Sequence, residues 1–444
     1  MATLLDFFLF LGVLALWTVA LQLLERGGYL AKWNLVPVGF FLMVKTRRGR
    51  DFIDRASRFR RAWTMFGDLS IVLVALTMVG ITALLVWEAI LVQNIPPDRA
   101  PSPEMLLGIP GINPIIPLGY GIFALAIAVG IHEFMHGILA RVAKVKIESL
   151  GLLFAILPIG AFVEPSEPEM KALPRRERAR IYSVGAGINL LLAVLFGVLF
   201  STMMLYGVEP VAPGIGIVDF TSPTAPALAS SWPEAMKAGS VITALNDTPT
   251  PTLSALQAAR SRTVPGQNVS VDAWVDGGAR RYWVILGDDG TGTPILGIRT
   301  VETTTGFYHP FTDAGRYGGV PGSMLLFISL PFTGYVPLQS PSTEFYRLTG
   351  PWAAVPAPAF YLIANTLYWL FWLNLMLGAT NALPAVPLDG GFVFKDGVEA
   401  ILARLRKGQP AEKRDRVVRA VSYAFALLIL ALIVWQFVGP RLRF

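Results

Sequence analysis

Two histidines and a glutamate stand within five residues of one another, in the segment His132-Glu133-Phe134-Met135-His136. Residues four apart share one face of a helix, so both imidazoles can reach one Zn²⁺ while Glu133 approaches the attacking water as a general base. The segment ends an apolar run, in which two imidazoles and a carboxylate are costly unless they face a functional interior. This cost favours a metal site over the alternative, a chance pair of histidines beside a structural glutamate.

A catalytic zinc normally takes a third protein ligand besides its water. The chain has no cysteine and only three histidines, so the third ligand is His309 or a carboxylate. We expect Asp389, because the orientation argued below places His309 on the far side of the membrane. Pro384 and Pro387 prevent a regular helix before Asp389, as expected of a stretch that lines a cavity. The Pro, Asp and Gly content alone favours a surface turn here, but the presence of the two histidines elsewhere in the chain favours a metal ligand. Two histidines and a carboxylate suit several divalent metals.

The composition is that of a membrane protein. Of 444 residues, 54% are hydrophobic and 15% are charged, against roughly 25% charged in soluble domains. Mean hydropathy is +0.55. These values exclude a disordered chain, and the lack of cysteine excludes a disulfide framework. The net charge of +7 comes mostly from Lys and Arg beside apolar segments, as the positive-inside rule describes, so no nucleic-acid partner is expected.

Six segments are long and apolar enough to cross the hydrocarbon layer, which takes about 20 residues. They are 4–24, 69–92, 115–140, 181–206, 357–383 and 417–438. We interpret the first as a retained helix, because it lacks the basic start and the cleavage site of a signal peptide. The runs 35–44 and 324–338 are too short or too interrupted to cross, and we expect them to be interfacial or re-entrant.

Basic residues decide the orientation, because cytoplasmic loops are rich in Lys and Arg. Ten basic residues lie between the first two segments, whereas 96–114 contains Arg99 alone. Further basic clusters follow the third and fifth segments. The two histidines and Asp389 are therefore expected near the cytoplasmic side, and 207–356 outside. Arg441 and Arg443, which this orientation leaves outside, are a mild conflict.

The stretch 207–356 is rich in Pro, Gly, Thr and Asp. Its patterns predict strands at 214–218, 240–245, 268–274 and 281–286, and a short helix at 252–260. The turn Asp276-Gly277-Gly278 is typical of a hairpin between the last two strands. We therefore expect a small β-rich domain on the outer side of the membrane.

Together the two metal motifs resemble those of the site-2 protease family of intramembrane zinc metalloproteases. Members carry H-E-x-x-H on one transmembrane helix and an N-x-x-P-x-x-x-x-D-G motif on a later one, matched here by Asn381, Pro384, Asp389 and Gly390. Weaker matches are Gly160-Ala161-Phe162-Val163, similar to a strand motif of the family, and Gly185-Ala186-Gly187-Ile188-Asn189, similar to a motif on its middle core helix. The resemblance covers 115–206 and 357–391.

The outer stretch resembles a PDZ domain, which many of these proteases carry between the second and third core helices. The similar segments are 222–227, 238–246 and 264–269, although Ser240 replaces the usual aspartate. In a PDZ fold, Ile215-Gly216-Ile217 is the candidate loop whose N–H groups meet a peptide terminus. A PDZ fold that filters substrates by size without binding a ligand is an equal alternative.

The resemblance implies a polytopic α-helical membrane protein with about six transmembrane helices, a three-helix catalytic core and an inserted small β-rich PDZ-like domain. It divides the chain into peripheral N-terminal helices with a basic loop (1–114), the first part of the core (115–206), the PDZ-like domain (207–300), a linker (301–356), the third core helix (357–395), and a basic loop with a C-terminal helix (396–444).

The resemblance also implies one Zn²⁺ per chain, held by His132, His136 and Asp389, with Glu133 as the general base. Asn189 and Asn381 are candidates for stabilising the oxyanion or positioning the substrate, and interhelical hydrogen bonding is an equal alternative. The implied substrates are single-span proteins of the cell membrane, trimmed outside by an upstream site-1-type protease and cleaved in regulated proteolysis and signalling.

A helical substrate must unwind before cleavage, because its peptide groups are bonded within the helix. The strand expected near 154–163 can bind the unwound segment by β-addition. A transporter or channel is disfavoured because paired interrupted spans in two similar halves are absent from the sequence. A proteolytically silent relative would have lost Glu133 or a ligand, and a protease merely anchored in the bilayer would carry its motif in the outer stretch.

Overall fold

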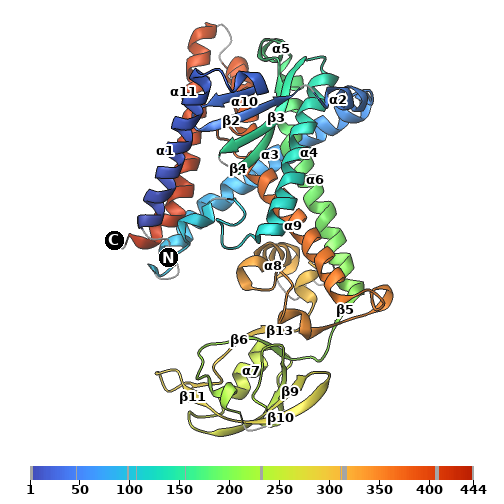
Figure 1. Cartoon of the computed structure of the whole chain (residues 1–444), viewed down its shortest axis with the longest axis vertical. Coiled ribbons are helices and arrows are strands. Elements are labelled where there is room, and N and C mark those ends of the chain that lie inside the picture. Colours follow the sequence, from blue (N-terminus) through green and yellow to red (C-terminus); the bar gives the residue numbers. More distant parts are fainter. Residues whose placement is uncertain are drawn as a thin grey trace. The chain divides into compact units, whose positions relative to one another are not determined.

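The computed structural model describes residues 4–46, 48–97, 100–106, 108–155, 157–230, 234–310, 312, 318–405 and 410–442. The chain divides into two compact units, one of Met1–Leu195 with Leu370–Phe444 and one of Phe196–Trp369. Helices α6 (Arg175–Gly207) and α9 (Ala357–Asn381) contribute residues to both units (Figure 1). The second unit is therefore wider than the predicted outer stretch, because it includes the ends of two predicted spans.

Five helices of the described residues are long and apolar enough to cross a membrane. They are α3 (Arg60–Leu91), α4 (Leu118–Val142), α6, α9 and α11 (Ala411–Val438), and each overlaps one predicted span. Helices are required there because lipid offers backbone N–H and C=O groups no other partners. The first predicted span is helix α1 (Leu4–Arg26), which is not one of these five, so the count of six spans stays a prediction.

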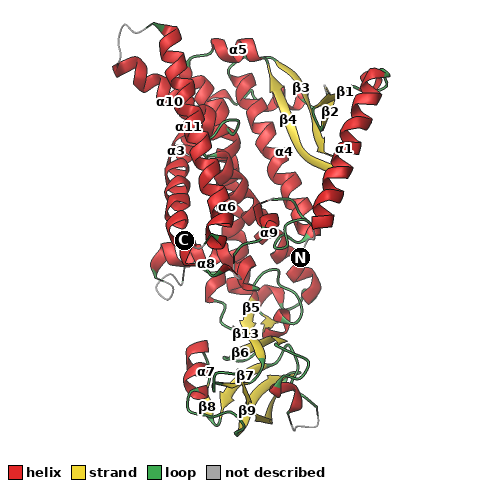
Figure 2. Cartoon of the chain, turned by 90° about the vertical axis from the view of Figure 1, so that its left-hand side faces the viewer, coloured by secondary structure: helices red, strands yellow, loops and turns green. Residues whose placement is uncertain are grey.

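The first unit contains a four-stranded antiparallel sheet in the order β1-β2-β3-β4 (Figure 2). Its strands are β1 (Leu35–Val38), β2 (Phe41–Thr46), β3 (Ile147–Ala155) and β4 (Leu157–Pro165). The run 35–44 forms a hairpin that pairs with β3, and its interfacial or re-entrant position stays a prediction. The predicted strand near 154–163 is confirmed as β4, which lies at the edge of the sheet and packs against α4.

A buried apolar cluster joins α2 (Arg50–Ala56), α4, β3, α5 (Glu167–Ala172) and α6. Its central members are Ile53, Met135, Leu139, Ile147, Met170 and Val184. In α3 and α11 only 17% of the apolar window is buried, against 39% in α4. Helices α3 and α11 are thus peripheral, and the packed part of α4 is the part that carries the two histidines.

The second unit contains a sheet in the order β10-β9-β7-β6-β13, with β8 (Thr248–Pro249) paired to β7. The strands are β6 (Ile215–Phe220), β7 (Val241–Leu245), β9 (Asn268–Val275), β10 (Gly278–Ile285) and β13 (Ile298–Glu302). The predicted strands are confirmed, and helix α7 (Leu253–Arg260) begins where Thr252 caps it by accepting from the Ala255 N–H. The predicted hairpin turn is confirmed too, since Asp276 and Gly277 have φ of 50° and 81°, as a type I′ turn requires.

The remaining elements of the second unit are short. Strand β5 (Val208–Pro210) pairs with β14 (Tyr346–Leu348), and β11 (Gly287–Asp288) pairs with β12 (Pro294–Ile295). Helix α8 (Gly319–Thr333) is apolar but has 15 residues, fewer than the roughly 20 that a span takes. This agrees with the expectation that the run 324–338 does not cross.

Candidate metal centre

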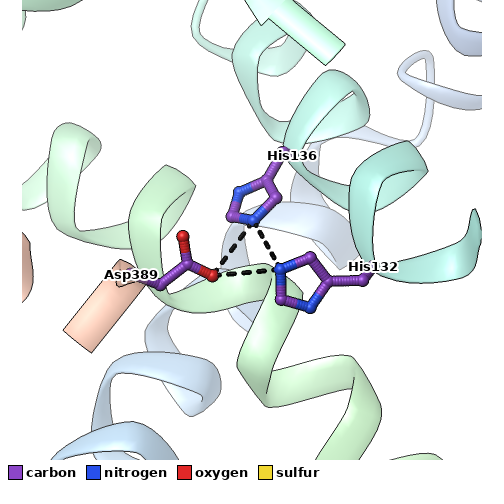
Figure 3. Close-up of side chains that lie close together, drawn as sticks. All are labelled: His132, His136 and Asp389. Carbon is purple, nitrogen blue, oxygen red and sulfur yellow. Dashed lines mark hydrogen bonds and ion pairs between the residues drawn. The ribbon is translucent and has the colours of Figure 1, made fainter. Parts of the chain in front are cut away.

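Three side chains predicted as metal ligands lie together in the first unit (Figure 3). Helix α4 places His132 and His136 one turn apart, and Asp389 is the first residue of α10 (Asp389–Leu405). The two Nε2 atoms are 3.2 Å apart, and each is 3.2 Å from Oδ2 of Asp389. Among the residues that the structure describes, this is the one group of three or more potential ligands so close together.

The spacing of the three atoms fits a tetrahedral metal ion. Zinc bonds of about 2.0–2.1 Å at tetrahedral angles put neighbouring ligand atoms about 3.3 Å apart, close to the 3.2 Å on all three sides here. Three protein donors also leave a fourth position for water or substrate, as in catalytic zinc sites. The donor set and its geometry are therefore compatible with zinc.

Asp389 reaches the histidines because the chain turns sharply after α9. The residues from Ala382 to Leu388 form turns rather than helix, as Pro384 and Pro387 predicted. A Cβ at Gly390 would collide with the Ala382 carbonyl, and one at Gly391 would collide with the backbone of Ala385. The two glycines thus let the first turn of α10 pack directly on the preceding loop.

Ion pairs hold α10 against α6. Arg178 donates to both carboxylate oxygens of Asp396 at 3.0 and 2.9 Å, and Arg175 donates to Glu399 at 2.7 Å. The Arg178 and Asp396 side chains are only 17% and 12% exposed, and such planar bidentate pairs combine energy with directional specificity. They tie the helix that carries Asp389 to the helix beside both histidines.

The carboxylate of Asp389 is poised to act as an anionic ligand. Burial raises the pKa of Asp389, but the neighbouring His136 and His132 lower it by a larger amount. The pKa of Asp389 therefore lies below the ordinary range. The ionised form, which can coordinate a cation, is therefore the one that the site favours.

Glu133 lies beside the three ligands rather than among them. It is half-buried, and its Oε2 accepts the Val163 N–H of β4 at 3.2 Å. Glu133, His136 and Asp389 line the same cavity of about 860 Å³, with Tyr182 and Phe392 stacked at its wall. A carboxylate at this place can exchange protons with water or a reacting group in the cavity.

The outer nitrogens of the imidazoles are both bound by α6. His132 Nδ1 lies 2.7 Å from Asn189 Oδ1, and His136 Nδ1 lies 2.7 Å from the Ile181 carbonyl. Asn189 was predicted as an oxyanion or substrate-positioning residue, but its NH₂ group already donates to Ala128 O and to Asn374 Oδ1. The predicted alternative, an interhelical hydrogen bond, describes Asn189 better. Asn374 was missed, although an amide inside the apolar run of α9 was a visible signal.

Two other predicted positions are not among the residues that line the cavity. Asn381 is the half-buried last residue of α9 and does not line the cavity. His309 lies in the second unit, where its Nδ1 is 3.2 Å from the Ser201 carbonyl. This placement agrees with the prediction that His309 is not a metal ligand.

The structure does not support Ile215-Gly216-Ile217 as a loop that binds a peptide terminus. The three residues lie in β6, between β7 and β13, and are buried. The Ile217 N–H already donates to the Ser240 carbonyl at 2.8 Å, so a peptide carboxylate cannot bind it without opening the sheet. Alternating apolar residues identified the strand, but they do not show which strand edge is free.

The second unit has a groove elsewhere, between α7 and the edge strand β13. It has a volume of about 270 Å³. Its apolar lining comes from Leu253, Leu256, Ile295, Leu296 and Ile298, and Arg260 lies at its side. A helix facing an unpaired strand edge is a geometry that can take up an extended peptide.

Fold and site together define a multi-pass integral membrane protein with a metalloprotease-type centre at the end of an apolar helix. The model of Peptidase family M50 matches residues 120–429, and the chain belongs to this family, the site-2 protease family. A similar protein is an uncharacterized protein of Methanocaldococcus jannaschii, 24% identical over 399 residues, which are 89% of this chain and 88% of that one. The family is that of intramembrane metalloproteases, which confirms the resemblance seen in the sequence.

Proposed function

We propose that the protein is a zinc endopeptidase that cleaves membrane-anchored proteins within or near their transmembrane segments. The observation that carries this proposal is the triangle of His132, His136 and Asp389 beside Glu133. Glu133, His136 and Asp389 line one cavity. The triangle lies at the end of an apolar helix rather than in the β-rich unit. This favours a substrate that arrives through the membrane.

Zinc bound by the three ligands would polarise the scissile carbonyl and lower the pKa of a water toward 7. Glu133 would then accept the proton of the attacking water and deliver it to the leaving amine. The Val163 N–H orients the Glu133 carboxylate toward the cavity. Asp389 keeps its place because α6 and α10 are joined by ion pairs, and contacts with α6 hold the two imidazoles.

Substrate binding is assigned to the edge strand β4. Among the described residues no further strand pairs with its outer edge. The Val163 N–H donates to Glu133, and Val163 and Pro165 line the cavity. An unwound substrate segment can add to this edge and place a peptide bond beside Glu133. Unwinding is needed because a helix bonds its own carbonyls.

The biological setting is proposed from charge and family. The basic loops favour an orientation with the metal centre near the cytoplasmic side of the cell membrane and the β-rich unit outside. Cleavage there would release a cytoplasmic fragment of a single-span substrate that an upstream site-1-type protease has trimmed, in a signalling role. The groove between α7 and β13 would contact the trimmed outer end in a PDZ-like manner, with filtering by size as the alternative.

The test is cleavage of a tagged single-span substrate by purified full-length protein in detergent, with metal content measured on each variant. Wild type is expected to hold one zinc and cleave, Glu133→Gln to keep zinc without cleaving, and Asp389→Asn to lose zinc. Glu148→Gln, at an exposed position of β3, is the matched control and should behave as wild type. A wild-type protein that binds no metal would refute the proposal, and full zinc in Asp389→Asn would refute the third ligand.

A further inference from the structure

A stripe of three α6 positions, each one turn from the next, faces the metal ligands. The Ile181 carbonyl meets His136 Nδ1 and the Asn189 amide meets His132 Nδ1, both at 2.7 Å. Gly185 lies midway between them, and a Cβ there would lie 2.6 Å from His132 Nε2 and closer still to His136 Nε2. The stripe therefore binds the Nδ1 atom of each imidazole and leaves room beside the two Nε2 atoms, and it supplies no metal ligand itself.

The direction of the hydrogen bonds at Asn189 follows from its partners. The Ala128 carbonyl can only accept, so the NH₂ group of Asn189 must face it, at 3.1 Å, and Oδ1 must face His132. Asn374 supports this orientation, because its own NH₂ group donates to the Leu370 carbonyl and its Oδ1 accepts from Asn189 at 2.8 Å. Asn189 and Asn374 are both fully buried, so water does not compete for these bonds.

This chain of bonds selects one form of His132. Because Asn189 Oδ1 accepts, Nδ1 of His132 carries a proton, and Nε2 is left as the nitrogen that can bind an ion beside Asp389. The Ile181 carbonyl imposes the same form on His136. Partners that bind the outer nitrogen of a metal-ligating histidine fix its tautomer and orientation, and their loss typically weakens metal binding by 10-fold to 100-fold.

We propose that Ile181, Gly185 and Asn189 of α6 position the metal ligands, with Asn374 as an outer support, and that Asn189 acts through His132 rather than on the substrate. Gly185 keeps open the space between the two imidazoles that an ion needs. This inference rests on the proposed function, because it concerns the same metal centre. It assigns Asn189 a positioning role and removes it from the oxyanion donors.

The experiment uses purified full-length protein in detergent. Zinc affinity is measured by competition with a chelator, and the visible spectrum of the Co²⁺-substituted protein reports the ligand geometry. We expect Asn189→Leu to bind zinc 10-fold to 100-fold more weakly with a changed Co²⁺ spectrum. Asn374→Leu should show a smaller loss than Asn189→Leu.

Gly185→Ala provides an independent arm, with Gly130→Ala as its control. Gly130 lies on α4 two residues before His132, and a Cβ there meets nothing within 4 Å. Gly185→Ala should lose more than 100-fold in zinc affinity, whereas Gly130→Ala should match wild type. If Asn189→Leu does not fold, this glycine pair decides the matter.

Two results would overturn the inference: wild-type zinc affinity and Co²⁺ spectrum in Asn189→Leu with a reduced kcat, or equal zinc binding by the two glycine variants. The first would place the Asn189 amide on the substrate. Absence of zinc binding by the wild-type protein would instead refute the proposed function, so the two failures are distinguishable.

Discussion

Replacing Arg178 with methionine tests whether the ion pair between α6 and α10 holds Asp389 at the metal centre. Arg178 and Asp396 form two hydrogen bonds of 2.9 and 3.0 Å and are 17% and 12% exposed. Two unit charges about 4 Å apart attract by about 4 kcal/mol at an effective dielectric constant near 20, and desolvation offsets part of this. Removing one partner also leaves the other charge poorly solvated, so we expect Arg178→Met to lower the free energy of unfolding by about 3 kcal/mol.

The assay is a double-mutant cycle, with unfolding followed by SDS titration in mixed micelles. The double variant Arg178→Met with Asp396→Leu leaves no unpaired charge, so its cost should be about 1 kcal/mol, well below the sum of the single variants. Arg176→Met is the control, because that side chain is 72% exposed and exposed pairs contribute about 0–1 kcal/mol. Zinc affinity should fall with Arg178→Met and not with Arg176→Met. Additive costs in the double variant, or equal effects of Arg178→Met and Arg176→Met, would refute the reasoning.

Three further outcomes are expected. The Lys45 ammonium lies 2.7 Å from Glu164 and holds the pKa of that carboxyl below its usual range. The ion pair therefore stabilises the folded protein when the pH is above the ordinary glutamate pKa. This stabilisation is lost as the pH falls through the lowered pKa. Lys45→Met should accordingly melt below wild type at pH 7, and this gap should narrow as the pH is lowered past the ordinary glutamate pKa; a gap that widens toward low pH would contradict this sign. Leu253→Arg should fill the groove of the second unit and abolish binding of an extended peptide in calorimetric titration, whereas Ala258→Arg, at an exposed position of α7 that does not line the groove, should retain most of it; equal binding by Leu253→Arg and wild type would place the peptide elsewhere. Chelation of the metal should lower the melting temperature of wild type by more than that of Asp389→Asn, because only the wild type loses a bound ion, and equal shifts would argue against Asp389 as a ligand.

The spans and the metal motif were predictable from sequence because both depend on local patterns. A run of about 20 apolar residues must be helical in lipid, and a spacing of four then puts His132 and His136 on one face. The position of Asp389 was predictable only through the pairing of two distant motifs. Its approach to the histidines depends on Gly390 and Gly391, whose tight packing on the preceding loop is visible only in three dimensions.

The features that the sequence did not reveal depend on pairing between distant segments. The run 35–44 was read as one apolar stretch, yet Gly39, with φ of 64°, turns it into the hairpin of β1 and β2. The strand at Ile215–Ile217 was recognised, but its two neighbours in the sheet were not, and they remove it from the list of ligand-binding edges. A free edge is a property of sheet order, which alternation along one strand does not contain.

Helix α6 links these observations, because all three ligands are positioned relative to it. Arg175 and Arg178 near its start hold α10 and thereby Asp389, while Ile181 and Asn189 further along hold the two imidazoles. The equal 3.2 Å sides of the ligand triangle thus arise from contacts along a single rigid helix. Helices α4 and α10 come from distant parts of the chain. Each is held by its own contacts with α6, and these contacts bring the ligands of the two helices together. This arrangement also explains why α6 carries arginines at one end and a buried amide in its apolar run, a combination that lipid burial alone would disfavour.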